Sequence, residues 1–291
     1  MLKASILVAI SGILYGFLGL IGSAILREHI DINTMLFWRF LLAGLWLSFS
    51  SYQKNHKKSS LDKPNKRVLF AMFCLGALGY AGSSGFYFMA CQYMGTGLSM
   101  VTFYSYPVSV ALFSVLFYKY VLDKTTMITL IAIICGLFLL RDASSNHIHI
   151  LGMIYGILAA FSYAIYVLGG KQFSSQKIDS DQLSSMVCFG SAFVFLPLAL
   201  LSSHSILPHS IKLWTYLIIF AVLITAIPIQ LMLEGLKSIS SMRASIISVL
   251  EPIVTLMVGV GLLHESITFT QALGATIILI SALLVQFQKD L

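Results

Sequence analysis

The residue with the strongest chemical implication is a glutamate in apolar surroundings. Glu251 precedes Pro252 near the centre of an apolar stretch over 242–262. An ionised carboxylate at the bilayer centre costs at least about 2.5 kcal/mol, so this side chain must face a cavity, be paired or hold a proton. Glu251 is therefore a candidate for contact with a bound molecule and for proton coupling. The alternative is a structural role, in which a protonated Glu251 satisfies backbone groups near Pro252.

Two prolines interrupt apolar stretches at equivalent places. Pro107 and Pro252 lie 145 residues apart, each in the middle of an apolar stretch. Proline has no N–H, so the carbonyls of Phe103 and Ser248 lose their helical partners. Broken helices near the bilayer centre often line binding sites, and both prolines are therefore candidate helix-break or gating residues. The alternative is a simple packing kink.

Polar and aromatic side chains at helical spacing predict a lining for one shared cavity. Each set alone is also explained by Ser and Thr bonding within the helices. Tyrosines that converge from several helices favour the cavity, which we expect to be moderately polar and aromatic. The candidate substrate-cavity residues are Tyr15, Ser83, Tyr87, Thr102, Tyr106, Tyr163, Tyr166, Gln230, Ser248 and Glu251.

Enzyme chemistry is not supported by the motifs. The stretch from Gly82 to Gly85 resembles the Gly-x-Ser-Gly pattern of intramembrane serine proteases, but all seven histidines fall in predicted loops or at span ends. A serine nucleophile needs a base, normally histidine. No paired-Asp magnesium motif lies at a helix end, and no phosphate-binding loop is present. We expect no catalytic residue, metal or cofactor; an intramembrane enzyme remains the alternative class.

The composition predicts an all-α integral membrane protein. Of the 291 residues, 58% are hydrophobic and 10% are charged, whereas soluble domains carry about 25% charged residues. Ten apolar spans are long enough to approach or cross a bilayer of about 30 Å. The net charge of +7 sits in short loops and does not indicate a nucleic-acid partner. The predicted spans are 4–26, 33–52, 67–90, 96–118, 126–141, 151–171, 181–202, 213–234, 242–262 and 268–287.

Charge asymmetry predicts the orientation in the cytoplasmic (inner) membrane. With a cytoplasmic N-terminus, 14 of the 18 Lys and Arg residues fall on that side, three fall opposite, and Arg39 lies within a span. Both termini are therefore expected inside. Arg39 is close enough to its span end to snorkel to the outer interface. Five spans per half require inverted halves, and we place these two five-helix repeats at 1–146 and 147–291.

The second half carries residues that resemble a known family. In order they are Ala244 to Leu250, Glu251-Pro252, Gly259, Leu263-His264-Glu265, Gln271 and Gly274-Ala275, and Phe37-Trp38-Arg39-Phe40 with Ala43 adds a further pattern. This order is similar to that of the EamA branch of the drug/metabolite transporter superfamily. The first half departs from it: Tyr106 precedes Pro107 where Glu251 precedes Pro252, and Tyr120 stands where Glu265 stands.

The resemblance implies a fold and a function class. The first, third, fourth, sixth, eighth and ninth spans would surround a central cavity, with the fifth and tenth as braces. We expect a secondary transporter for a small organic metabolite that works by alternating access. Because the predicted cavity offers tyrosines, hydroxyls and one acid, we expect this metabolite to be an amino acid or related zwitterion. Its partners would be the substrate, the lipid bilayer and, as a candidate coupling ion, protons. An exporter of toxic cationic compounds is the second alternative, and the sequence does not specify an oligomeric state.

Overall fold

Every element of the described residues is helical. The computed structural model describes residues 2–57, 65–140, 149–174, 178–202, 205–263 and 268–286. The first half contains α1 (Leu2–Tyr15), α2 (Leu18–Leu26), α3 (Ile32–Lys57), α4 (Lys66–Leu75), the π-helical turn η1 (Gly76–Tyr80), α5 (Ala81–Phe103), α6 (Tyr106–Tyr118) and α7 (Lys124–Leu140). The second half contains α8 (Ile150–Ser174), α9 (Ser180–Leu201), α10 (Ile211–Ala221), η2 (Val222–Ala226), α11 (Ile227–Leu236), α12 (Ser241–Ser248), α13 (Leu250–Leu263) and α14 (Phe269–Gln286).

These elements form ten apolar segments, as predicted. Eight are long and apolar enough to cross a membrane, and the shorter α7 and α14 complete the set within the described ranges. The third and fourth segments are joined at Gly95, whose φ of 73° lies in the left-handed region that favours glycine. The predicted repeat junction at residue 146 lies outside the described residues.

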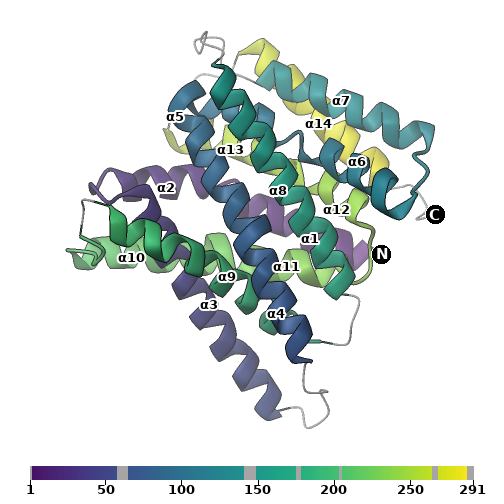
Figure 1. The fold of residues 1–291 in the computed structure, drawn as a ribbon. Coiled ribbons are helices and arrows are strands. Elements are labelled where there is room, and N and C mark those ends of the chain that lie inside the picture. The colour runs from purple at the N-terminus through teal and green to yellow at the C-terminus, as the bar shows by residue number, and fades with distance from the viewer. Residues whose placement is uncertain are drawn as a thin grey trace.

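Helix contacts follow a two-fold pattern between the halves (Figure 1). The second segment α3 packs on the seventh, α9, and the fifth segment α7 packs on the tenth, α14. The first segment packs through α1 on α11 of the eighth, and the equivalent α8 of the sixth packs on α5 of the third. Because each half has five segments, the second half has the opposite orientation in the membrane.

The braces α7 and α14 cross at very short range. A Cβ on Gly274 would lie 2.5 Å from the Gly136 carbonyl oxygen, and a Cβ on Gly136 would lie 2.7 Å from a side-chain carbon of Ile278. Small residues allow such close backbone approach between membrane helices. The two short segments therefore form a pair at one edge of the molecule (Figure 1).

Two π-helical turns, which the sequence did not predict, occupy equivalent positions. η1 begins at Gly76 in the third segment, and η2 begins at Val222 in the eighth. A π turn leaves backbone groups out of the regular ladder. The Ser191 hydroxyl donates to the Gly76 carbonyl at 3.0 Å, and the Thr225 hydroxyl donates to the Phe220 carbonyl at 2.9 Å. Each bulge is thus stabilised by a hydroxyl group.

Candidate functional site

The fourth and ninth segments are each interrupted in the same way. α5 ends at Phe103 and α6 begins at Tyr106, while α12 and α13 are separated by Val249 alone. Pro107 lies in the first turn of α6 and Pro252 in the first turn of α13, where a missing N–H costs no helical hydrogen bond. The chain therefore accommodates each proline by starting a new helix. We call these the first-half break (104–107) and the second-half break (249–252).

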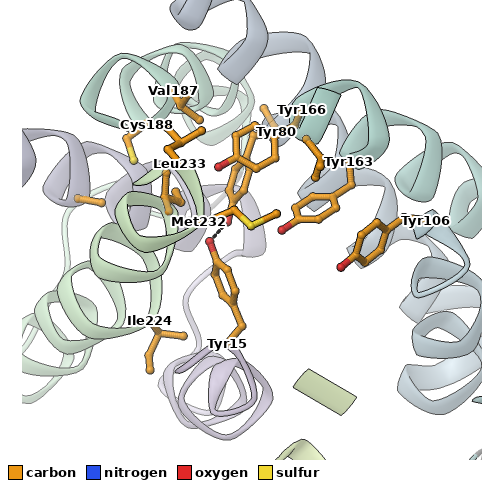
Figure 2. Packing of buried hydrophobic residues seen from close by; sticks show 14 of the residues in the cluster. Tyr15, Tyr80, Tyr106, Tyr163, Tyr166, Val187, Cys188, Ile224, Met232 and Leu233 are labelled. Carbon is orange, nitrogen blue, oxygen red and sulfur yellow. Dashed lines mark hydrogen bonds between the residues drawn. The ribbon is translucent and has the colours of Figure 1, made fainter. Parts of the chain in front are cut away.

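A group of tyrosines gathers in the buried core (Figure 2). The hydroxyls of Tyr15 and Tyr80 share a hydrogen bond of 2.7 Å. The Tyr80 ring meets that of Tyr166 edge-on, with centroids 4.9 Å apart, and the ring of Tyr163 meets that of Tyr106 at 4.6 Å. The Tyr166 hydroxyl is buried with no partner among the described residues. We call these five residues the tyrosine cluster; its members come from both halves.

Glu251 lies beside this cluster at the second-half break. The side chain is half-buried, and it forms no ion pair within the described residues. The Tyr104 hydroxyl, from the first-half break, is close enough to the Glu251 carboxyl group to interact with it electrostatically. Tyr106 and Tyr163 are also within electrostatic range of the carboxyl. The acid therefore faces aromatic hydroxyls across the interface between the halves.

Residues of α12 complete this side of the site. The Tyr106 hydroxyl donates to the Ser245 carbonyl oxygen at 3.0 Å. The Ser248 hydroxyl donates to the Ala244 carbonyl at 2.9 Å and lies 3.9 Å from the sulfur of Met232. The first-half break is thus joined directly to α12, by a side chain of one half and the backbone of the other.

Arg39 does not snorkel to the interface as expected. Its side chain is 2% exposed, and its Nε donates to the Thr225 hydroxyl at 2.7 Å in η2. The guanidinium lies 4.7 Å from the ring centroid of Phe220 and 5.1 Å from that of Phe40. The seventh and eighth segments pack over α3. The Arg39 side chain therefore does not extend to the outer interface, as its position near the end of the span had suggested.

Gln230 points away from the tyrosine cluster. Its side-chain amide donates to Asp181, which is fully buried and also accepts from Lys54 Nζ and the Ser50 hydroxyl, both at 2.6 Å. The basic residue nearest to Asp181 in the sequence is Lys177, whereas Lys54 and Gln230 reach it only because α3 and α11 pack on α9. Glu234, one turn after Gln230, accepts from Ser180 and pairs with Lys237.

The remaining predicted residues divide between the site and helix packing. Tyr87 adjoins the cluster through Phe103, whose ring centroid is 5.4 Å from that of Tyr87 and 5.5 Å from that of Tyr163. Thr102 donates to the Ser99 carbonyl and packs against Gly156, where a Cβ would lie 2.1 Å from its hydroxyl. Ser83 is buried in α5.

Three aromatic residues of the site were missing from the prediction. Tyr80 lies three residues before Ser83 and seven before Tyr87, so the same helical face already contained it. Tyr104 belongs to the first-half break, where the irregular backbone interrupts the helical periodicity, and Phe103 is the last residue of α5 before it. Only their proximity to Pro107 in the sequence indicated them.

Comparison with known proteins assigns both halves to one kind of protein. The model of the "EamA-like transporter family" matches residues 2–141 and again residues 150–287. One solved crystal structure superposes with a TM-score of 0.82, at 16% identity, over 99% of both chains. This structural similarity supports the ten-segment fold.

Several transporters are similar in sequence. The "Threonine/homoserine exporter RhtA" of Escherichia coli is 25% identical over 220 residues, 72% of this chain and 68% of the exporter. An "Uncharacterized transporter" of Archaeoglobus fulgidus is 28% identical over 203 residues, 68% of this chain and 70% of its own. The "Uncharacterized inner membrane transporter YicL" of Salmonella typhimurium is 22% identical over 292 residues, 99% of this chain and 96% of its own.

Proposed function

Because the chain belongs to the EamA-like transporter family, we propose that it is a secondary transporter that moves a small zwitterionic metabolite, such as an amino acid, by alternating access. The family is one of transporters, so the chain is a multi-pass membrane transporter and not an enzyme. The observation that carries the proposal is the tyrosine cluster with a single acid, Glu251, assembled at the meeting point of the two helix breaks.

The chemistry of this site matches the two charges of an amino acid. The Glu251 carboxylate pairs with the ammonium group, and the rings of Tyr106 and Tyr163 provide cation–π faces for it. Hydroxyl groups are hydrogen-bond donors for the carboxylate, and the buried Tyr166 hydroxyl has its donor unused. Substrate carbon atoms pack against Met232 and the aromatic rings. The function printed for RhtA supports this substrate class.

Glu251 is also the proposed coupling residue. It lacks an ion-pair partner among the described residues, so a bound proton and a bound substrate ammonium compete for the same carboxylate. Competition of this kind links proton movement to substrate movement in opposite directions. We propose proton-coupled antiport, with Pro107 and Pro252 marking the hinges.

Transport by the purified protein tests the substrate class. Proteoliposomes are loaded with labelled threonine, homoserine, a neutral aromatic amino acid or an organic cation, and efflux is followed with and without a pH gradient. We expect saturable movement of at least one zwitterionic amino acid, accelerated by the gradient. Movement confined to the organic cation would replace the substrate class with toxic cations, and movement of none of these compounds would refute the proposal.

We place the protein in the cytoplasmic membrane with both termini inside and with repeats at 1–146 and 147–291. The charge distribution and the similarity to an inner membrane transporter support this placement. A cysteine near Lys57 is expected to react with an impermeant maleimide only from the cytoplasmic side, and one near His147 only from outside. Reaction of both from one side would contradict two inverted halves.

A further inference from the structure

The two-fold packing pattern is broken at one face of the membrane. On the face where α1 begins, which we call the N-terminal face, α6 packs on α12 and α8 packs on α11. On the opposite face the equivalent partners are the last turn of α5 with α13, and α2 with α5. Neither of these pairs packs comparably among the described residues. On this difference in packing between the described residues, we call the N-terminal face the closed face and the opposite face the open face.

One hydrogen bond lies in the closed contact. The Tyr106 hydroxyl donates to the Ser245 carbonyl at 3.0 Å, and it joins the start of α6 to α12. Tyr106 is 1% exposed and Ser245 is fully buried, so the bond is shielded from water and its loss leaves a buried carbonyl unpaired. It holds the first-half break to α12 on the closed side.

The internal repeat identifies the equivalent groups on the open side. An offset of 145 residues relates Pro107 to Pro252, and it therefore relates Tyr106 to Glu251 and Met100 to Ser245. When alternating access exchanges the conformations of the halves, the group that takes the place of the Tyr106 hydroxyl is the Glu251 carboxyl. Its acceptor is the backbone carbonyl of the turn around Met100.

We propose that Tyr106 and Glu251 are paired gate latches, Tyr106 closing the N-terminal face and Glu251 closing the opposite face when it holds a proton. A phenolic hydroxyl always has a hydrogen to donate at neutral pH, whereas an ionised carboxylate only accepts. Closure of the N-terminal face is therefore independent of protons, and closure of the other face requires one. This inference rests on the alternating access of the proposed function and adds the step at which the proton acts.

In the part of the chain that the structure describes, no other group near Glu251 offers an equivalent switch. The groups within electrostatic range of it are Arg39 and the hydroxyls of Tyr80, Tyr87, Tyr104, Tyr106 and Tyr163. Of the elements that pack on α13, neither α2 nor α14 contains a titratable residue, and α1 contains only Lys3 near its start and Tyr15. Glu251 is thus the acid in this region.

The test measures opening of the N-terminal face without any substrate. The four native cysteines are replaced by alanine, and Ser114, which is buried in α6, is changed to cysteine as a reporter. The rate of its reaction with N-ethylmaleimide in detergent is measured between pH 5 and pH 8. Because only the thiolate reacts, this rate is divided at each pH by the rate of the same protein unfolded in sodium dodecyl sulfate, and the reporter rate is this ratio. We expect the rate to rise several-fold as the pH falls, because protonated Glu251 favours the form that is open at the N-terminal face.

Three variants on this background separate the latches. Tyr106→Phe removes the first latch, and we expect a several-fold faster reaction at every pH with the pH response retained. Glu251→Gln keeps a permanent donor and should react fast at all pH values, whereas Glu251→Leu has no donor and should react slowly at all of them. Size-exclusion chromatography of each variant confirms that it is folded.

Two results would overturn the inference. One is a reporter rate that Tyr106→Phe leaves unchanged, and the other is the same rate for Glu251→Gln and Glu251→Leu. If Tyr106→Phe fails to fold, the comparison of the Gln and Leu variants alone decides. Because no substrate is present, a wrong substrate class in the transport assay leaves this readout unaffected.

Discussion

The two helix breaks have the same backbone design and different chemistry. Both consist of a short non-helical link followed by a helix with proline in its first turn. The first-half break carries Tyr106 before its proline, and the second-half break carries Glu251. Tyr106 is bonded to the other half, whereas Glu251 is half-buried with Tyr104 within electrostatic range.

This difference shows how a duplicated fold can acquire direction. Identical breaks would give two faces of equal stability and equal response to protons. With a hydroxyl in one break and a carboxyl in the other, the proposed latches predict that only one face responds to protonation. A protonated carboxyl and a phenol donate similar hydrogen bonds, so the geometry of the repeat tolerates the exchange.

The largest effect is expected from making the acid permanently neutral. Glu251→Gln keeps shape and donor capacity but cannot bind or release a proton, so we expect transport to fall about tenfold or more and to lose its pH dependence. Tyr106→Phe in the other break should reduce transport less and keep the pH dependence. Rates are measured against pH in liposomes at matched protein levels. Superimposable curves for Glu251→Gln and wild type would reduce Glu251 to a backbone brace.

The sequence was sufficient to predict the fold at the level of segments. The composition of each apolar stretch was enough to predict the ten segments. The fifth was predicted to be short, at 126–141, and the structure has it as Lys124–Leu140. The pairing of Pro107 with Pro252 at a constant offset also indicated the repeat. These features depend on the local sequence alone, so they are predictable without the tertiary structure.

Features that depend on contacts between segments were not predictable. The π-helical turns leave no local signature, although each places a critical residue: Tyr80 ends η1, and Thr225 in η2 binds Arg39. Gln230 was predicted to line the substrate cavity, but its side chain is hydrogen-bonded to Asp181 from another segment. Partners of this kind are fixed by tertiary packing.

The second-largest effect concerns the backbone of the breaks. Pro107→Ala and Pro252→Ala each restore an N–H, which favours a continuous helix and a stiffer hinge. We expect each to lower transport several-fold while lowering expression less. Comparing the two variants in the efflux assay shows whether both halves move. Unchanged rates in both would mean that the prolines serve packing alone.

The third effect compares the two π-helical turns. Thr225→Val keeps the shape but leaves the buried Arg39 Nε and the Phe220 carbonyl without a partner, at a cost of about 1–3 kcal/mol. Ser191→Ala removes only a second hydrogen bond from the Gly76 carbonyl, which also accepts from the Ala81 N–H, and strands no charged donor, so we expect at most about 1 kcal/mol. Thermal unfolding in detergent measures both, and an equal or reversed order would show that Arg39 does not depend on Thr225.

The smallest effect is expected from the ion pair that joins the halves at the open face. Lys212 Nζ lies 2.7 Å from a Glu28 carboxylate oxygen, and this hydrogen bond lowers the pKa of Glu28. The folded-state pKa is below the unfolded one, so the pair stabilises at pH values above the ordinary range of glutamate, and this contribution is lost as the pH falls through the folded value. Both side chains are at least partly solvated, and such pairs contribute little.

We expect the thermal unfolding midpoint of Glu28→Gln to lie slightly below that of the wild type at pH 7 and to converge with it at low pH. A decrease at pH 7 as large as that of Thr225→Val would show that this contact, and not the buried bulge, holds the halves together on the open side.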